Sequence, residues 1–211
     1  MRRRTYERFS ALDGVSLEVG KGDFIGIVGK NGSGKSTLLK IIAGIYRAGD
    51  GEVHVDGSVA PFLELGIGFQ QELTARENIF INGTLLGMTR KEIMGKFDRI
   101  VSFAEVENFL DLKIKNFSSG MRARLAFAIA KEADADIYLC DEVLAVGDAA
   151  FQTKCIEVFK KWHEEGKTIV LVTHDSGRVR ELCNRAVVLE KGRLVFDGPA
   201  GDAVDEYERR L

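Results

Sequence analysis

Residues 29–37 read Gly-Lys-Asn-Gly-Ser-Gly-Lys-Ser-Thr, a run that fits the pattern G-x-x-x-x-G-K-[ST]. Glycines at these positions let backbone N–H groups turn inward around phosphate oxygens. A glycine-rich turn with an unrelated lysine would be the simpler explanation. The flanks argue against it, because an apolar run at 23–28 enters the loop and another at 36–43 leaves it. We therefore predict a strand, a phosphate loop and a helix whose N-terminus points at the anion.

The motif predicts a nucleoside triphosphate as the ligand, with Mg²⁺ beside it. Lys35 can reach the terminal phosphates and is a candidate catalytic residue, while the Ser36 hydroxyl is a candidate metal ligand. The residues expected to contact the nucleotide are Gly29, Asn31, Gly32, Ser33, Gly34, Lys35, Ser36 and Thr37.

Composition sets the broad class of the chain. Its 211 residues are 45% hydrophobic, which is enough to bury an α/β core as one domain with a small lobe. The net charge of −2 provides no basic field, so nucleic-acid binding is not expected. Without an apolar run near the ~20 residues that span a bilayer, membrane contact is expected only through a partner. The three cysteines lack CxxC pairing and are expected to be buried thiols.

Apolar strands and helical segments alternate along the second half of the chain. This order predicts a mostly parallel sheet covered on both faces, with ligands at the carboxyl ends of the strands. The expected strands are 137–140 and 168–172 and the pair 186–189 and 193–196, with helices after 119, at 149–165 and after 172. In the first half, residues 13–19 alternate like a half-buried strand, and 52–55 suggest an antiparallel hairpin. Residues 74 to about 112 have helical spacing and form a predicted insert.

Two carboxylates, Asp141 and Glu142, follow the apolar run 137–140. A parallel sheet would place them beside the phosphate loop, where Asp141 can hold Mg²⁺ and Glu142 can polarise the attacking water. A solvated acidic pair at a strand end is the alternative. The upstream phosphate loop favours the catalytic interpretation, because the metal would offset the repulsion between two carboxylates and a triphosphate.

His174 follows the next apolar strand, 168–172, at the same predicted sheet edge. A lone histidine is usually structural, but at this edge we favour a sensor of the γ-phosphate that orients the water and Glu142. Ser118, Ser119 and Gly120 precede a predicted helix and could form a second phosphate site. Considered alone, they would be only a helix N-cap.

Together these motifs resemble ATP-binding cassette (ABC) ATPases over essentially the whole chain. The phosphate loop, Ser118 to Met121, Asp141-Glu142, Gly147-Asp148 and His174 occur in that family's order and approximate spacing. The resemblance implies an α/β P-loop NTPase fold with a RecA-like core, an antiparallel β lobe and a helical lobe. It implies one nucleotide-binding domain, 1–211, with a helical subdomain at approximately 74–132. It also implies ATP as the nucleotide and a homodimer formed on ATP binding, since the serine-glycine signature of one copy closes on ATP held by the other.

Further roles come from the resemblance alone. Tyr6 matches the aromatic that stacks on adenine, with Phe9 as the other candidate surface, and Asp148 matches the acidic residue that couples the two sites. Glu64 stands where the family usually has a glutamine, so it is an expected metal or water ligand. Gln70 is the other candidate for that role and for contact with a membrane partner.

In three places the sequence departs from the common cassette pattern, and there it resembles ATPases that export O-antigen, teichoic acid and related lipid-linked polysaccharides. The signature reads Phe-Ser-Ser-Gly-Met at 117–121, Val143 follows the acidic pair, and 63–69 read Leu-Glu-Leu-Gly-Ile-Gly-Phe. This resemblance implies a separate integral-membrane permease and a peripheral place on the cytoplasmic face of the inner or plasma membrane. An ABC ATPase for another cargo, one acting on nucleic acid or ribosomes, and a kinase built on the same loop are the alternatives. Many such ATPases have a further N-terminal strand or a C-terminal carbohydrate-binding domain; a compact natural form and a trimmed one both fit this sequence.

Overall fold

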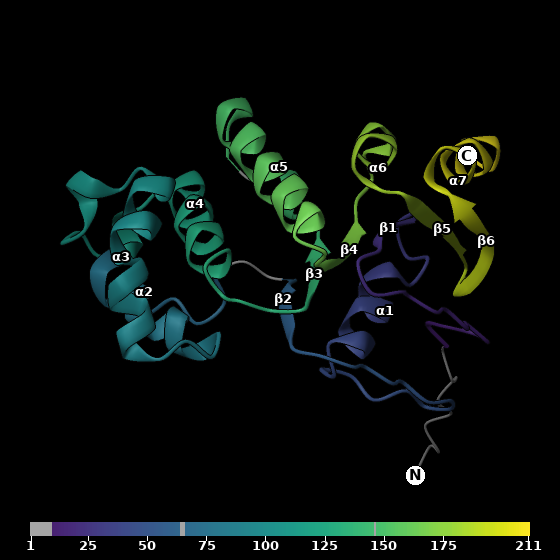
Figure 1. Cartoon of the computed structure of the whole chain (residues 1–211), viewed down its shortest axis with the longest axis horizontal. Coiled ribbons are helices and arrows are strands. Elements are labelled where there is room, and N and C mark those ends of the chain that lie inside the picture. The colour runs from purple at the N-terminus through teal and green to yellow at the C-terminus, as the bar shows by residue number, and fades with distance from the viewer. Residues whose placement is uncertain (1–9, 64–65, 146) are drawn as a thin grey trace, which may run out of the picture.

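The computed structural model describes residues 10–63, 66–145 and 147–211, and its centre is a sheet (Figure 1). Six strands lie in the order β2-β3-β4-β1-β5-β6. Neighbouring strands run parallel, except β5 and β6, which are antiparallel. Their bounds are β1 Phe24–Val28, β2 Val59–Phe62, β3 Ile137–Asp141, β4 Thr168–Val172, β5 Arg185–Glu190 and β6 Arg193–Pro199.

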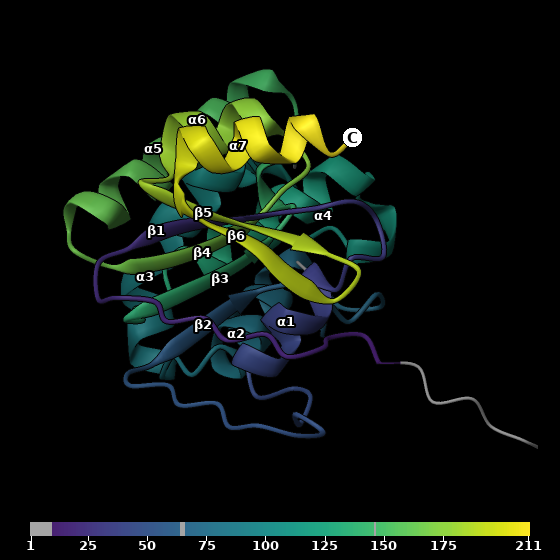
Figure 2. The ribbon, with the colours of Figure 1, turned by 90° about the vertical axis from the view of Figure 1, so that its right-hand side faces the viewer.

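Helices cover both faces of the sheet (Figure 2), as expected for a mostly parallel sheet whose strands are buried on both sides. Every residue of β1 and β4 is buried, which explains their unbroken apolar sequences. Helix α1, Lys35–Ile42, lies on one face. The other face carries α5 Ala149–Glu164, α6 Ser176–Leu182 and α7 Ala200–Arg209.

Three helices form a lobe beyond the β2 edge of the sheet: α2 Ala75–Leu85, α3 Arg90–Ala104 and α4 Ser119–Ala130 (Figure 1). Thr74 and Thr89 begin the first two helices with capping boxes, in which each threonine exchanges hydrogen bonds with the glutamate three residues later. Two short 3₁₀ turns, η1 Glu107–Phe109 and η2 Ile114–Asn116, link α3 to α4. A third, η3 Val143–Ala145, follows β3.

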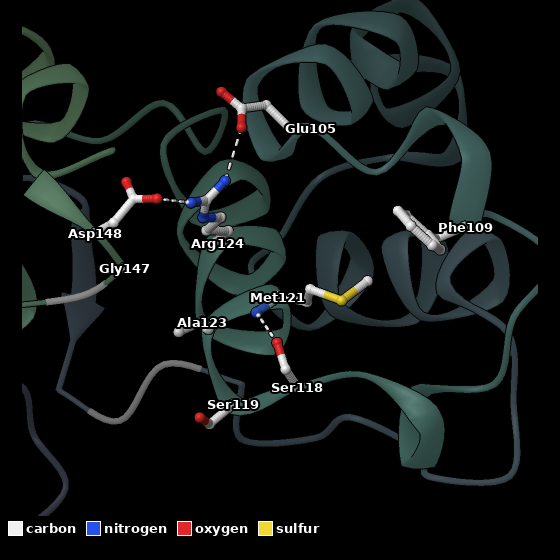
Figure 3. A pocket seen from close by; sticks show the side chains of 10 residues that line it. Glu105, Phe109, Ser118, Ser119, Met121, Ala123, Arg124, Gly147 and Asp148 are labelled. Carbon is white, nitrogen blue, oxygen red and sulfur yellow. Dashed lines mark hydrogen bonds and ion pairs between the residues drawn. The ribbon is translucent and has the colours of Figure 1, made fainter. Parts of the chain in front are cut away.

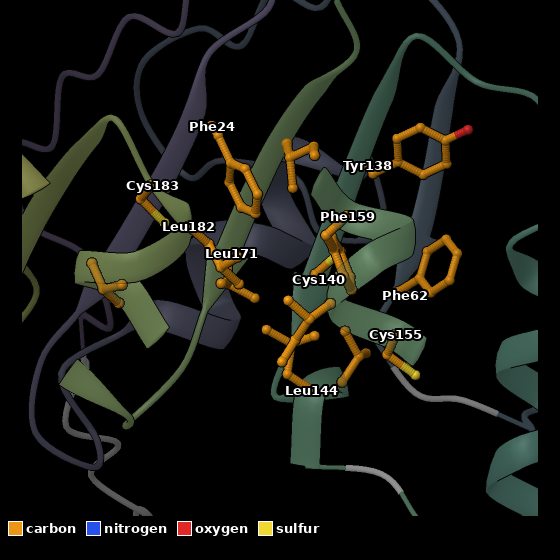
Figure 4. Close-up of a cluster of buried hydrophobic side chains, with 14 of the residues drawn as sticks. Phe24, Phe62, Tyr138, Cys140, Leu144, Cys155, Phe159, Leu171, Leu182 and Cys183 are labelled. Carbon is orange, nitrogen blue, oxygen red and sulfur yellow. The ribbon is translucent and has the colours of Figure 1, made fainter. Parts of the chain in front are cut away.

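Aromatic side chains fill the core between the sheet and α5 (Figure 4). Phe24 from β1 lies against Phe159 from α5, with ring centroids 6.2 Å apart. At the far edge of this core, Tyr138 stacks on Trp162 with centroids 3.9 Å apart and planes within 6°. A second apolar cluster lies within α2, α3 and α4, and a third packs α1 against the opposite face of the sheet.

The predicted α/β class with a mostly parallel sheet is confirmed. The expected antiparallel β lobe is not found among the described residues, because neither 13–19 nor 52–55 forms a ladder with any described strand. Val15, Leu17 and Val19 do pack against the cluster around α1, so their alternation records a half-buried face. A strand also needs a hydrogen-bonded neighbour, and no described segment supplies one here. None of the helices in the described ranges is both long enough and apolar enough to cross a bilayer.

Candidate nucleotide site

The phosphate loop connects β1 to α1, as the sequence predicted. Gly34, just before the helix, has φ 107°, and a Cβ there would lie 2.7 Å from the carbonyl oxygen of Ala11. A Cβ on Gly29 would lie 2.2 Å from the carbonyl oxygen of Leu189. The turn therefore requires glycine at both positions, and it leads directly into the N-terminus of α1, whose first N–H groups have no intrahelical partners.

Lys35 is buried at the base of this loop, with 8% of its surface exposed. Its Nζ donates to the carbonyl oxygens of Gly29, at 2.6 Å, and Lys30, at 3.0 Å. Burial lowers the pKa of this ammonium from its ordinary value, while the nearby carboxylates of Glu142 and Asp141 act in the opposite direction. The structure thus brings the loop lysine and the acidic pair together.

The loop fits a triphosphate with its metal. The Ser33 hydroxyl is buried and has no hydrogen-bond partner among the described residues, although buried polar atoms are normally paired. Ser36 is exposed at the start of α1, where its hydroxyl is free to reach a cation. Asp141 ends β3, which is separated from β1 by β4 alone, and its carboxylate and the Ser36 hydroxyl are both oxygen ligands that Mg²⁺ accepts.

Glu142 and His174 meet at the edge of the sheet, as predicted from their strands. His174 Nδ1 lies 3.0 Å from Glu142 Oε1. The backbone N–H of Glu142 donates to the carbonyl oxygen of Val172 at 2.9 Å, which anchors the residue to the end of β4. Glu142 also has a positive φ of 51°, an uncommon conformation for a residue with a side chain.

Ser118, Ser119 and Gly120 lie apart from this group, on the helical lobe (Figure 1). Ser118 is the N-cap of α4, and its hydroxyl accepts from the N–H of Met121 at 3.1 Å. These residues line an open hollow of about 670 Å³ (Figure 3), and no residue of the phosphate loop contributes to it. Within one chain, the two predicted phosphate sites are therefore separate.

Asp148 lines the same hollow and caps α5, where its Oδ1 accepts from the N–H of Phe151 at 2.9 Å. This hydrogen bond, together with the Arg124 guanidinium, lowers the pKa of the Asp148 carboxyl from its usual value. Arg124 Nη2 donates to Asp148 Oδ2 at 2.5 Å (Figure 3). Arg124 was not predicted, since α4 carries another arginine, Arg122, and nothing in the sequence separates the two.

Two predicted site residues, Tyr6 and Glu64, lie outside the described residues. Gln70 lies within them and is held by Asn78, a residue to which the sequence assigned no role. Asn78, fully buried in α2, accepts from the N–H of Gln70 at 2.7 Å and donates to its carbonyl at 3.0 Å. An asparagine four residues into the predicted helical segment is a signal that could have identified this contact, because asparagine is disfavoured in helix interiors and often bonds to nearby backbone groups.

Comparisons with known proteins agree with this geometry. Residues 12–145 match the family described as ABC transporter. An ABC transporter protein of Aeromonas salmonicida is 47% identical over 96% of this chain and 66% of its own length. An O-antigen export system ATP-binding protein of Klebsiella pneumoniae is 43% identical over 97% of this chain and 83% of its own. A teichoic acids export ATP-binding protein of Lactiplantibacillus plantarum is 41% identical over 96% of this chain, which spans about 55% of that protein.

Among solved structures, a dimeric ATP-binding cassette in a post-hydrolysis state, bound to ADP and Pi, has a TM-score of 0.80. It is 27% identical and covers 94% of each chain. The chain described here therefore belongs to the ABC transporter family. The resemblance to ABC ATPases and the P-loop NTPase fold inferred from the sequence are confirmed.

Proposed function

We propose that this chain hydrolyses ATP as one half of a homodimer and so drives export of a lipid-linked polysaccharide through a separate membrane permease. The contact between Glu142 and His174 beside Lys35 carries the catalytic part of the proposal. The export part is supported by the named functions of the O-antigen and teichoic-acid relatives. An ABC ATPase for another cargo remains the alternative.

The loop residues hold the phosphates. Lys35, Ser33 and the N–H groups at the start of α1 supply positive charge and donors, and the glycines let the backbone approach closely. Ser36 and Asp141 would hold Mg²⁺, which neutralises charge on the phosphate oxygens when bound. Glu64 would be a further oxygen ligand, and Tyr6 would stack on the adenine.

Glu142 would act as the base. Its carboxylate takes a proton from water as the water oxygen bonds to the γ-phosphorus, and the bond to the β,γ-bridging oxygen breaks to release ADP and phosphate. His174, 3.0 Å from Glu142, orients that carboxylate and contacts the γ-phosphate.

The separation of the two phosphate sites supports the dimer. Because Ser118, Ser119 and Gly120 lie apart from the loop of their own chain, they would close on ATP held by a second copy, with Asp148 coupling the two sites. Closure on ATP and reopening after hydrolysis would drive the permease from the cytoplasmic face of the membrane, where this chain would be peripheral. No direct membrane or nucleic-acid contact is proposed.

Purified protein with Mg·ATP tests the enzymatic part. We expect stoichiometric inorganic phosphate without a phosphorylated acceptor, and a phosphorylated acceptor would indicate a kinase instead. The export part is tested in the source strain with this gene replaced by the variant. Loss of surface polysaccharide on Glu142→Gln substitution, restored by the parent gene, is expected, whereas unchanged surface polysaccharide would refute export.

A further inference from the structure

One arginine joins three elements around the hollow. The Arg124 guanidinium donates to Glu105 Oε2 at 2.7 Å and to Asp148 Oδ2 at 2.5 Å, and it lies 5.2 Å from the centre of the Phe151 ring. Its side chain is only 20% exposed. An isolated surface ion pair contributes little, but a planar guanidinium held by two carboxylates and a ring has a fixed direction.

The partners of Arg124 belong to different parts of the fold. Glu105 ends α3 in the helical lobe and has a positive φ of 58°, so its side chain leaves the helix toward Arg124. Asp148 begins α5, which packs on the sheet. Lys154, in the second turn of α5, pairs with the other oxygen of Glu105. We call Glu105, Arg124, Asp148 and Lys154 the Arg124 network, and it ties the lobe to the sheet.

The network borders the Ser118–Gly120 turn. Glu105, Arg124 and Asp148 line one wall of the hollow, and Ser118, Ser119 and Gly120 line another (Figure 3). Helix α4 connects the two walls, because Ser118 of one wall caps that helix and Arg124 of the other wall lies on it. A displacement of α4 would therefore move Asp148 together with the Ser118–Gly120 turn.

We propose that Arg124 is a positioning residue, which holds Asp148 in register with the Ser118–Gly120 turn so that one chain presents both to a second copy as a single rigid surface. This inference rests on the proposed dimeric ATPase. It predicts that Arg124 acts on the opposing nucleotide and leaves the phosphate loop of its own chain unaffected.

Arg124→Gln tests the assignment. We expect kcat to fall by about tenfold or more, since small misplacements in a reacting complex can cost up to ~10²-fold, while ATP affinity of the separate chain stays within about twofold. Arg124→Lys should recover part of the loss, because an ammonium keeps the charge without the two-armed geometry. The matched control is Arg99→Gln, which removes an arginine paired with Glu132 elsewhere in the same lobe and should leave kcat unchanged.

Mixing two variants separates positioning from simple destabilisation. A dimer of one Arg124→Gln chain and one Lys35→Ala chain has one site with intact Lys35 and an intact opposing Arg124. We expect the mixture to hydrolyse ATP faster than the sum of the two proteins measured separately. Absence of that gain, or an Arg124→Gln kcat equal to the parent's, would overturn the assignment.

A second variant covers the case in which Arg124→Gln does not fold. Glu105→Asn removes one carboxylate but keeps a residue that tolerates positive φ, and it should lower kcat with unchanged ATP affinity. An unchanged kcat would count against the network. If the parent protein itself releases no phosphate from ATP, the proposed function fails, and that result is distinct from any failure of Arg124.

Discussion

Glu142 combines an uncommon backbone conformation with a specific side-chain contact. Its positive φ sets it where β3 has just ended, and its carboxylate reaches His174 at 3.0 Å. Such conformations cost on the order of 1–3 kcal/mol and persist where the surroundings enforce them. Here the hydrogen bond from its N–H to Val172 provides that enforcement.

Glu142→Gln should keep ATP binding and abolish turnover. The amide has nearly the same shape but cannot take the proton of the attacking water, so we expect a loss of about 10²–10⁴-fold in phosphate release. Nucleotide affinity, measured by equilibrium binding, should not weaken. Glu157→Gln, at an exposed position of α5, is the matched control. A Glu142→Gln protein that hydrolyses ATP at the parent rate would refute the role of base.

The thiols of Cys155 and Cys183 should be unreactive in the folded protein. Burial raises the pKa of both to about 12, so the reactive thiolate is expected only as the pH rises toward that value. At pH 8, a disulfide reagent such as Ellman's should detect no thiol until urea is added and then the full 3. Rapid reaction of the folded protein would contradict this burial.

Some of the site could be predicted from single residues and some could not. Lys35, Asp141, Glu142 and His174 follow apolar runs or a glycine-rich loop, so their common edge follows from parallel-strand geometry. Arg124 gave no such signal, because its role depends on partners 19 and 24 residues away in the chain. Periodicity and local motifs carry no information about such pairs.

At the scale of the elements, the helical insert from 74 to about 112 was predicted, but its division into α2 and α3 was not. Thr74 and Thr89 each precede a glutamate by three residues, and both form the full capping box. Residues 13–19 were less informative, because their alternation reports a half-buried face and does not identify a partner strand. At 52–55 the alternation does not report even that, since Val53 is exposed. Helix α7 was not predicted at all, although Gly198 and Pro199 precede it; no side chain caps the helix, and β6 runs directly into it.

Thr74→Ala should destabilise the helical lobe. The substitution removes the acceptor for the Glu77 N–H and half of the capping box, and such losses cost about 0.5–2 kcal/mol. Urea unfolding followed by circular dichroism gives the free energy of unfolding. Thr84→Ala in the same helix is the control, because its hydroxyl only bonds back to the carbonyl of Phe80 and alanine is a better helix former. Equal effects of the two substitutions would argue against the cap.

For the whole molecule, the proposed homodimer, in which the Ser118–Gly120 turn of one chain completes the site of the other, makes activity a property of two chains. We expect the ATPase rate per chain to rise with protein concentration until dimers saturate. With Mg·ATP, Glu142→Gln should accumulate as a dimer in size-exclusion chromatography with light scattering. A strictly monomeric protein with the same rate per chain would contradict the shared site.

Removal of the metal provides an independent check on the same scale. Chelation of Mg²⁺ by EDTA should abolish phosphate release, because Asp141 and Glu142 would then face the triphosphate without the divalent charge that offsets their repulsion, and Lys35 alone supplies a single positive charge. Restored release on adding excess Mg²⁺ is expected. Phosphate release that persists in EDTA would exclude the metal from the reaction.

The stack of Tyr138 on Trp162 makes the molecule its own optical reporter. Trp162 is the sole tryptophan, so all indole emission comes from one point in the core between the sheet and α5. The quantum yield and wavelength of its emission will report the unfolding of that core and will not report the unfolding of α2 and α3. Fluorescence and circular dichroism should therefore give coincident transitions if lobe and sheet unfold together, and separate ones if the lobe detaches first.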